Sequence, residues 1–449
     1  MKSLSKFVHK VEAENKDHFA LFHAGRISTI FLSKDCEKLV SELESGLDES
    51  TLNPEANEIL LQLQNEGFLS SEDQDFATLS RLQKTLHPRL CLMYLIITDH
   101  CNLGCKYCFI EAGFPSDYQC NEMSWDTAKS ALDYFIEHRE QDAECSVWLY
   151  GGEPFMNQEL LFSCLDYMSR NDPEVKVVIV NNGTMITEEI ASKLALFSNL
   201  QISVSLDGPK EINDQKRIDK SGNGSYDRIM KGINNLRNNN IQFGISCTIA
   251  EHNVDSIDSI LEWICDETGS KDIGVNFLVD TPRAFVDEEY IKKANDGMIR
   301  FVDKARFTDI YEGRMIRKIE TFAEQVPRWH DCGACGEQMV ISPTGEVGVC
   351  HEGLGERRTF VGELVPDFDY FGNATIKEWS NRSPLNMPEC EECIAFGVCG
   401  GGCPYGAMLR YGSIWNVDKR FCIHSKDTLQ WLIWDLYDRM ELQDETDVS

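Results

Sequence analysis

The stretch Cys101-Asn102-Leu103-Gly104-Cys105-Lys106-Tyr107-Cys108 places three cysteines within eight residues, directly after the apolar run 93–98. An unalternated apolar run of this length is typical of a strand buried on both faces of a parallel sheet. Thiolates this close together can bind a metal centre but cannot form three disulfides. On a four-iron cluster, three thiolates leave one iron without a protein ligand, and that iron can bind a small molecule through nitrogen and oxygen. The alternative is a zinc knuckle, which needs a fourth ligand nearby.

The composition limits the class of protein. With 449 residues and 42% hydrophobic content, the chain should fold as two to four domains. Its 18 cysteines and its start, Met1-Lys2-Ser3-Leu4, without an apolar signal segment, favour a cytoplasmic location and metal binding over disulfides. No apolar run is long enough to cross a membrane. The net charge of −31 argues against a nucleic-acid partner, which would need a basic face.

Further apolar runs follow the first one at intervals that leave room for helices. In one of these intervals, Ser124 can cap a helix that carries Ala128, Leu132 and Phe135 on one face. Repeated strand-helix units predict an α/β fold, a barrel or partial barrel over about residues 86–320, with its site at the carboxyl ends of the strands. The predicted strands are 93–98, 146–151, 175–180, 202–207, 243–250 and 273–279.

The spacing Cys101-x3-Cys105-x2-Cys108, with the aromatic Tyr107 before the last cysteine, resembles the signature of the radical S-adenosylmethionine (SAM) family. The resemblance implies a partial (β/α)6 TIM-type barrel and a [4Fe-4S] cluster that is held by the three cysteines and binds SAM beside Tyr107. It also implies reductive cleavage of SAM to a 5′-deoxyadenosyl radical, with flavodoxin or ferredoxin as electron donor.

Polar groups follow the later strands, where SAM is expected. Gly151-Gly152-Glu153-Pro154 follows the second strand, and its two glycines allow the backbone to approach a ligand closely. It resembles the family's GGEP motif, whose backbone contacts the SAM amino group. Asn182 offers an amide after the third strand. The resemblance also implies contacts from Ser205, Asp207 and Arg217 to the SAM ribose and carboxylate, for which an arginine fork is suited. For Asp207, a turn residue is the equally open alternative.

A second group of eight cysteines lies between residues 331 and 422. Eight thiolates could ligate two four-iron clusters or two zinc ions. The spacing Cys390-x2-Cys393-x5-Cys399-x3-Cys403, together with Gly345-x4-Cys350 and Cys422, resembles the SPASM domain of peptide-modifying radical SAM enzymes. The resemblance implies two auxiliary clusters, one held by Cys332, Cys335, Cys350 and Cys403 and the other by Cys390, Cys393, Cys399 and Cys422. The expected boundaries are 321–428 for this domain and 429–449 for a C-terminal helix and acidic tail. The other seven cysteines are interpreted as core residues, Cys120 less clearly than the rest.

The first 75 residues form a separate predicted unit. Apolar segments 19–22 and 27–32 around Gly25 predict a hairpin, and helices are expected over 34–47 and around Leu60. A strand should begin at 68–69, and the polar segment 70–75 is interpreted as a linker. The pattern resembles the winged-helix RiPP recognition element (RRE), which binds the leader of a precursor peptide as an added strand. A structural or dimerising domain is the alternative.

Together these resemblances imply an enzyme that matures a ribosomally made peptide (RiPP) through a thioether, carbon-carbon or ether cross-link. The alternatives are an anaerobic sulfatase-maturing enzyme and a non-catalytic iron-sulfur or zinc protein that binds peptides. Sulfatase-maturing enzymes carry an aspartate directly after the equivalent of Cys350, where this chain has His351, and they lack such an N-terminal unit. We expect His351 to be structural rather than a catalytic base. The GGEP turn and Arg217 favour catalysis over binding alone.

Overall fold

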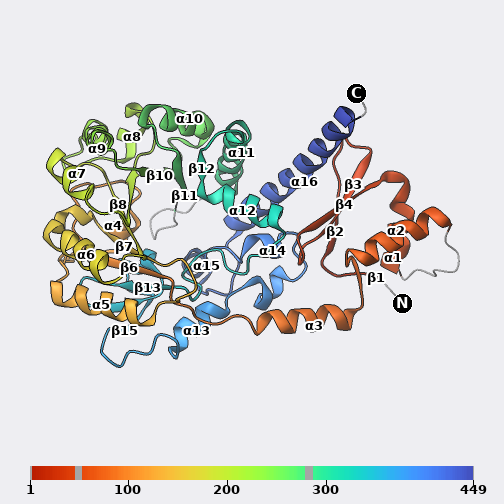
Figure 1. Ribbon diagram of the computed structural model, residues 1–449, viewed down its shortest axis with the longest axis horizontal. Helices are drawn as coiled ribbons and strands as arrows, with labels where there is room; N and C mark the ends of the chain where they lie inside the picture. Colours follow the sequence, from red (N-terminus) through yellow and green to blue (C-terminus); the bar gives the residue numbers. More distant parts are fainter. Residues whose placement is uncertain (1–2, 46–52, 279–286, 448–449) are drawn as a thin grey trace.

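The computed structural model describes residues 3–45, 53–278 and 287–447. A large sheet with its helices lies at one side of Figure 1 and a small N-terminal sheet with two helices at the other. The C-terminal third of the chain lies between them, and the long helix α16 (Lys419–Asp447) runs beside both. None of the helices in the described ranges is both long enough and apolar enough to cross a lipid bilayer.

All six predicted strands of the central unit are present, and each is parallel to the next along the chain. The sheet order is linear, β12-β11-β10-β9-β8-β7-β6-β13-β14-β15, so the parallel strands form an open arc, as expected for a partial barrel. The short β12 (Tyr311–Glu312) extends the arc. The predicted end at residue 279 lies outside the described residues. The six strands are β6 (Leu92–Thr98), β7 (Ser146–Gly151), β8 (Lys176–Asn181), β9 (Leu200–Ser205), β10 (Phe243–Ile249) and β11 (Asp272–Phe277).

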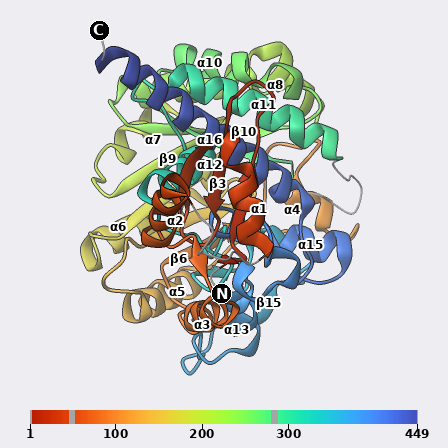
Figure 2. The same ribbon diagram turned by 90° about the vertical axis from the view of Figure 1, so that its right-hand side faces the viewer.

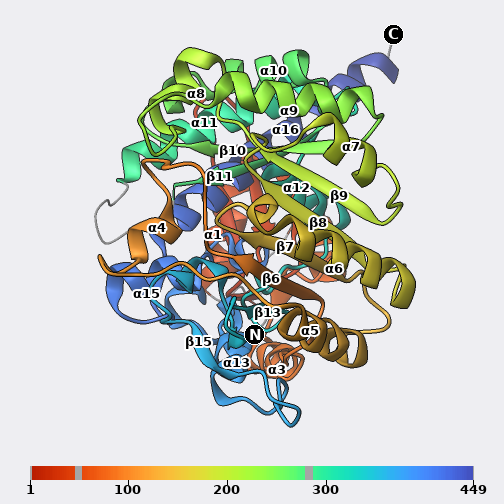
Figure 3. The same ribbon diagram turned by 90° about the vertical axis from the view of Figure 1, so that its left-hand side faces the viewer.

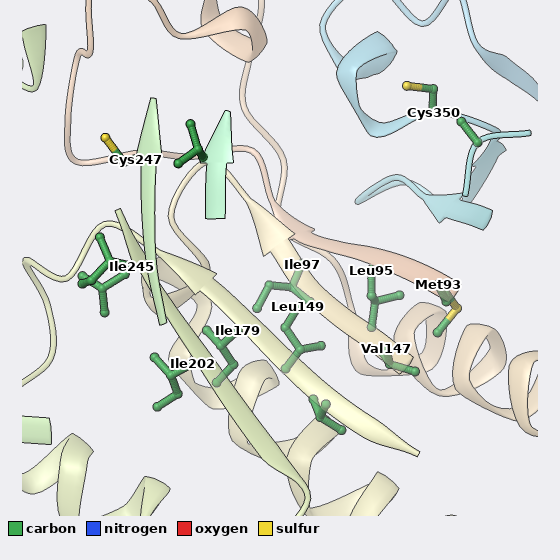
Figure 4. Close-up of a cluster of buried hydrophobic side chains, with 14 of the residues drawn as sticks. Met93, Leu95, Ile97, Val147, Leu149, Ile179, Ile202, Ile245, Cys247 and Cys350 are labelled. Atoms are coloured by element: carbon green, nitrogen blue, oxygen red, sulfur yellow. The ribbon is translucent and has the colours of Figure 1, made fainter. Parts of the chain in front are cut away.

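Alternate residues of these strands serve two different faces. Figure 4 shows side chains such as Leu95, Leu149 and Ile202 pointing from the strands into a common apolar core. The intervening residues, Tyr94 and Trp148 among them, point to the other face. The second face is only partly buried, since alternate residues of β7, β9 and β11 are half-exposed or exposed. The expectation of strands buried on both faces therefore holds for β6 but not for the whole sheet.

Helices connect the strands and lie along the outside of the sheet (Figure 3). The predicted cap is confirmed, because Ser124 Oγ accepts a hydrogen bond from Thr127 N at 3.1 Å, and Ala128, Leu132 and Phe135 are buried. These helices are α5 (Trp125–His138), α6 (Gln158–Asn171), α7 (Glu188–Leu194), α8 (Lys210–Lys216), α9 (Tyr226–Asn238), α10 (Ile257–Thr268) and α11 (Glu288–Ala305).

The C-terminal region is attached to the arc through β13 (Gln338–Ile341), which pairs in parallel with β6. Two antiparallel strands, β14 (Glu346–Gly348) and β15 (Phe360–Glu363), complete the sheet. The helices here are α12 (Gly313–Glu324), α13 (Ala374–Asn381), α14 (Phe396–Cys399), α15 (Pro404–Tyr411) and α16. Helix α16 begins ten residues before the helix that we predicted at 429, because it also includes the segment around Cys422.

The N-terminal hairpin is confirmed, with Phe19 opposite Leu32 in β3 (His18–His23) and β4 (Ser28–Ser33). The sequence did not predict the third strand, β2 (Val8–Val11), or the pairing of β1 (Ser3–Leu4) with β5 (Leu69–Ser70). Helices α1 (Glu37–Ser45) and α2 (Pro54–Asn65) cover one face of the sheet (Figure 2), and the end predicted at residue 47 lies outside the described residues. The other face packs on the C-terminal region, where Phe7 stacks on Phe396.

The predicted linker at 70–75 is wrong, because helix α3 (Glu72–Gln83) begins inside it. Ser71 caps this helix through a capping box with Gln74. The Asp75 carboxylate is buried and accepts hydrogen bonds from Ser5 Oγ at 3.0 Å and Lys6 N at 3.0 Å. The polar residues of this segment therefore begin a helix and fasten it to the N-terminal strand.

Candidate active site

A cavity of about 450 Å³ lies at the carboxyl ends of the parallel strands. Each strand of the arc contributes to it, either through its last residues or through the loop that follows. The polar residues that we singled out after the strands therefore meet at one place, as the topology requires. The predicted residues that line the cavity are Cys101, Cys105, Tyr107, Cys108, Gly151, Gly152, Asn182, Ser205, Arg217 and Cys403.

The cysteine loop is fixed by backbone contacts to the end of helix α8 and to the segment that follows it. Gly104 N donates to Ile218 O at 2.8 Å, and Lys106 N donates to Lys216 O at 3.0 Å. The Cys101 sulfur accepts from Leu103 N at 3.4 Å. Burial raises the pKa of Cys101 to about 12 and that of Cys105 to about 11. Both thiols therefore hold their protons at neutral pH until a metal displaces them, as expected of a buried thiolate site.

Asp207 positions two residues of the cavity wall. Its carboxylate accepts a hydrogen bond from the Tyr107 hydroxyl, forms a 3.2 Å ion pair with Arg217, and accepts from Thr248 N at 3.1 Å. The Arg217 guanidinium lies 5.6 Å from the centroid of the Tyr107 ring. Asp207 is completely buried and does not line the cavity, whereas Tyr107 and Arg217 do. The carboxylate thus fixes the orientation of an arginine that faces the cavity.

The GGEP turn is shaped by the cysteine loop beside it. A Cβ atom at Gly151 would lie 1.9 Å from Thr98 O, and one at Gly152 would lie 2.2 Å from His100 O. Gly152 N donates to Thr98 O at 3.0 Å, and Glu153 N donates to His100 O at 2.7 Å. The two glycines are therefore required by the close approach of two backbone segments, in addition to any ligand.

The Glu153 side chain is buried and does not line the cavity. Its carboxylate accepts from Phe155 N at 3.1 Å and from Asn182 N at 2.8 Å, so it joins the turn after β7 to the turn after β8. Burial raises the pKa of Glu153 to about 7. The Asn182 amide reaches the Asn102 side chain at 2.8 Å and lies 3.9 Å from the Cys101 sulfur. Glu153 therefore orders the loops around the cysteine site.

Sequence reasoning missed an aromatic wall on the inner face of the arc. The His351 ring stacks on Tyr94 at 4.2 Å, and Trp148 and Tyr150 lie against the same tyrosine. Burial lowers the pKa of His351 to about 4, so the imidazole is neutral at physiological pH. This packing agrees with a structural histidine. A signal for this wall was available in the sequence. Side chains alternate between the two faces along a strand, and this alternation places Tyr94, Trp148 and Tyr150 on the same face.

The sequence also gave no indication of a charged group at the side of the cavity near the C-terminal region. Arg314, Glu352 and Arg420 line the cavity there, together with Cys403. The Cys403 sulfur lies 4.0 Å from Glu352 Oε2. Burial raises the pKa of Glu352 to about 7. Glu352 could have been suspected from its place two residues after Cys350, but Arg314 carries no motif.

Several of the eight C-terminal cysteines lie close to one another. Burial, followed by the charges of Cys399, Cys393 and Cys390, raises the pKa of Cys422 to about 12. The pKa of Cys350 is likewise raised, first by burial, then by the charge of Glu352, and then by the charges of Cys403 and Cys332.

In residues 3–45, 53–278 and 287–447, no group of three or more His, Cys, Asp or Glu side chains is arranged to hold a single metal ion. A zinc ion needs its sulfur ligands about 2.3 Å away, whereas a four-iron cluster keeps its thiolates further apart. The donors at these cysteines are thiols, which fit iron-sulfur clusters.

Sequence comparison relates the chain to known enzymes. The family model described as the radical SAM superfamily matches residues 95–264. The radical SAM cyclopropyl synthase TigE of Paramaledivibacter caminithermalis is 24% identical over 93% of this chain and 93% of TigE. The Fe-coproporphyrin III synthase of Methanosarcina barkeri is 31% identical over 74% of this chain and 88% of its own.

Two solved structures share the fold. The structure of anSMEcpe with bound AdoMet matches with a TM-score of 0.67 and 18% identity, over 79% of this chain and 95% of that one. Streptococcus suis SuiB bound to its precursor peptide SuiA matches with a TM-score of 0.55 and 15% identity, over 94% of this chain and 100% of that one. The fold likeness to SuiB therefore extends over nearly the whole chain.

Proposed function

The chain belongs to the radical SAM superfamily, and on that premise we propose that it is a peptide maturase that cleaves SAM and cross-links a ribosomally made precursor peptide. The observation that carries this proposal is the cavity itself. Three cysteine thiols, a carboxylate-oriented arginine and the Asn182 amide face one space at the strand ends. Such a space suits a ligand with a carboxylate, an amine and hydroxyl groups, as SAM has.

In the proposed site, Cys101, Cys105 and Cys108 hold a [4Fe-4S] cluster that, when bound, supplies the electron for reductive cleavage of SAM to a 5′-deoxyadenosyl radical. Arg217 binds the SAM carboxylate through the terminal nitrogens that its ion pair with Asp207 leaves available. Ser205 and Asn182 are placed to hydrogen-bond the ribose and the polar groups beside it. The aromatic wall of Tyr94, Trp148 and Tyr150 keeps water away from the reacting carbon.

The two auxiliary clusters are assigned to the predicted quartets, with Cys332, Cys335, Cys350 and Cys403 for the first and Cys390, Cys393, Cys399 and Cys422 for the second. Cys403 is the member of these quartets that lines the cavity, so the first quartet is the one next to the substrate. An electron acceptor beside the substrate suits a reaction that removes two hydrogens and forms a bond. This placement supports a cross-link (thioether, carbon-carbon or carbon-oxygen) over a redox-neutral change. The name of the relative TigE, a cyclopropyl synthase, favours the carbon-carbon bond.

The small N-terminal sheet is proposed to bind the leader of the precursor peptide. Its outer strands, β2 and β4, each pair with β3 alone among the described strands, so each has one edge without a strand partner, as the addition of a peptide strand requires. The opposite face of the sheet packs on the C-terminal region. A bound leader would therefore lie near the second cysteine group, and the remainder of the peptide could reach the cavity.

The proposal that SAM is cleaved is tested with the reconstituted chain and dithionite. We expect 5′-deoxyadenosine from the wild type. The variant Cys265→Ala, which changes a cysteine of the outer helix α10, should form it too and serves as the control for a cysteine outside the proposed cluster sites. No 5′-deoxyadenosine from a sample with about twelve iron atoms per chain would reject the assignment.

The peptide substrate requires a separate experiment. We expect a short open reading frame beside the gene to encode the precursor, and mass spectrometry of the coexpressed peptide to show a loss of two hydrogens per link. A peptide of unchanged mass, in cells where the enzyme cleaves SAM, would contradict the cross-linking assignment.

Formylglycine formation is not favoured. At 18% identity the likeness to anSMEcpe concerns the fold alone. The residue after Cys350 is a half-buried histidine that stacks on Tyr94, and its pKa of about 4 makes it a weak base.

A further inference from the structure

Arg314 lies in the cavity wall without an acidic partner. It is the second residue of α12, and its side chain borders the cavity beside Phe421 and Glu352. Among the residues that the structure describes, it forms no ion pair with a carboxylate. Burial, followed by the nearby Arg317, lowers the pKa of Arg314. Arg314 is half-buried and forms no ion pair in the described part of the chain, so its guanidinium can bind an anion that enters the cavity.

The other arginines around the arc differ in this respect. Arg139 pairs with Asp172 at 2.7 Å, Arg217 with Asp207 at 3.2 Å, and Arg420 with Asp418 at 2.6 Å. The acid nearest to Arg314 in sequence, Glu312, is already engaged. Its carboxylate caps α12 by accepting from Arg314 N at 3.0 Å and Met315 N at 2.7 Å.

The Arg314 side chain is held in a fixed orientation. Nε donates to Val275 O at 3.0 Å, which leaves the two terminal nitrogens for another acceptor. The guanidinium carbon lies 4.6 Å from the Phe277 ring centroid and 5.6 Å from that of Phe421. Contacts to two aromatic rings fix the plane of the guanidinium, which is the condition for bidentate binding of a carboxylate.

Arg314 is also distant in topology from the cysteine loop. It lies against β11, whereas the cysteine loop follows β6, and the two strands stand at opposite ends of the six-stranded parallel arc. The cavity wall near Arg314 includes Cys403 and Phe421 of the C-terminal region. This is the side of the cavity that we assign to the peptide.

We propose that Arg314 binds a carboxylate of the peptide substrate, either an acidic side chain or the C-terminal carboxylate, and thereby fixes which residue faces the SAM site. This inference rests on the proposed peptide maturase and adds a substrate class to it. Glu352 also lines the cavity.

The test measures binding, without reductant, to the reconstituted full chain loaded with SAM. Equilibrium dialysis compares the capped peptides acetyl-Gly-Glu-Gly-amide and acetyl-Gly-Gln-Gly-amide. A second pair, acetyl-Gly-Ala with a free or an amidated C-terminus, distinguishes a side-chain from a terminal carboxylate. We expect at least one carboxylate peptide to bind about tenfold more tightly than its neutral partner, as charge-assisted hydrogen bonds allow.

Variants assign the preference to Arg314. Arg314→Met should abolish the tenfold preference, whereas Arg314→Lys should retain part of it. The matched control is Arg317→Met, one turn along the same helix, where the side chain bonds to Gly313 O and Asp331 O and does not line the cavity. The control should keep the full preference. If Arg314→Met does not fold, as judged by its melting temperature, Arg314→Gln replaces it.

Three results would overturn the inference: equal binding of both members of each pair by the wild type, an unchanged preference in Arg314→Met, or loss of SAM binding in that variant. The last would make Arg314 a cofactor residue. Formation of 5′-deoxyadenosine is measured in parallel after addition of dithionite. Its absence would count against the proposed function, while the carboxylate preference would be judged from the dialysis alone.

Discussion

The two cysteine-bearing regions of this chain reach their geometry in different ways. The first needs eight residues, because a strand end fixes one side of the loop and two backbone hydrogen bonds to residues 216 and 218 fix the other. The second draws its cysteines from residues 332 to 422 and has little regular structure around them. Its segments are joined by buried groups such as Arg382, which donates to Gly402 O at 3.0 Å and Asn416 O at 3.2 Å.

The regions also differ in what they face. All three cysteines of the first line the cavity, whereas Cys403 alone among the eight of the second does so. Figure 4 shows Cys350 on the C-terminal region, and its side chain belongs to the same buried apolar cluster as those of the strands. We infer that the first region carries out the cleavage chemistry and that the second supports the step on the peptide.

The largest effect should come from Cys105→Ser. Removing one of three thiolates should remove about four iron atoms per chain and lower 5′-deoxyadenosine formation by at least about 100-fold. The second region should keep its about eight iron atoms, measured by iron analysis of the purified variant. Formation of 5′-deoxyadenosine at more than about a tenth of the wild-type rate would contradict the division between the two regions.

The complementary change, Cys403→Ser, should spare SAM cleavage. We expect the loss of about four iron atoms and of the peptide product, while 5′-deoxyadenosine forms within about threefold of the wild-type rate. Iron analysis and mass spectrometry of the peptide measure the two effects. An equal loss of SAM cleavage in both cysteine variants would show that the regions act as one unit.

Asp207→Asn should have a smaller but still large effect on the first region. The substitution leaves the Arg217 guanidinium buried without its counter-ion, which costs on the order of 3–5 kcal/mol when a buried pair is broken. We expect a lower melting temperature and weaker SAM binding by equilibrium dialysis. Asp166→Asn, a change of an exposed aspartate on α6, is the control. Unchanged SAM affinity in Asp207→Asn would mean that Arg217 does not depend on this carboxylate.

The smallest predicted effect is a pH dependence of stability that belongs to the first region. Burial raises the pKa of Glu153 from 4.5 to about 7, so the folded chain holds this proton more tightly than the unfolded chain does. The contribution of Glu153 to stability is complete below pH 4.5 and falls as the pH rises to about 7, by roughly 3 kcal/mol in total. Glu153→Gln should remove this part of the slope in thermal melts between pH 5 and 8. An identical slope in the variant would show that the carboxylate is not buried as described.

Local patterns predicted the first region well. The strands and the loop 101–108 are recognised from residues that are neighbours in the sequence. Because consecutive strands lie side by side and parallel, their carboxyl ends come together at one edge of the sheet. The same reasoning assigned Gly151 and Gly152 to the cavity but gave an incomplete reason, since their close neighbours are Thr98 O and His100 O.

Contacts between distant segments were not predictable. Arg314 reaches the cavity because α12 packs beside β11 and the Phe421 ring covers it, and neither contact leaves a periodic trace in the sequence. Asp75 was read as part of a linker because its partner Ser5 lies 70 residues away. In the sequence, a buried charged residue whose partner is remote cannot be told from an exposed one. A prediction from composition therefore places such a residue on the surface.

Electron paramagnetic resonance of the Cys403→Ser/Cys422→Ser double variant tests the central claim most directly, because the variant keeps only the first cysteine group intact. After reduction with dithionite, the account predicts one cluster signal whose g-values and linewidth change on addition of SAM. A signal that SAM leaves unchanged, in a sample with about four iron atoms per chain, would contradict it.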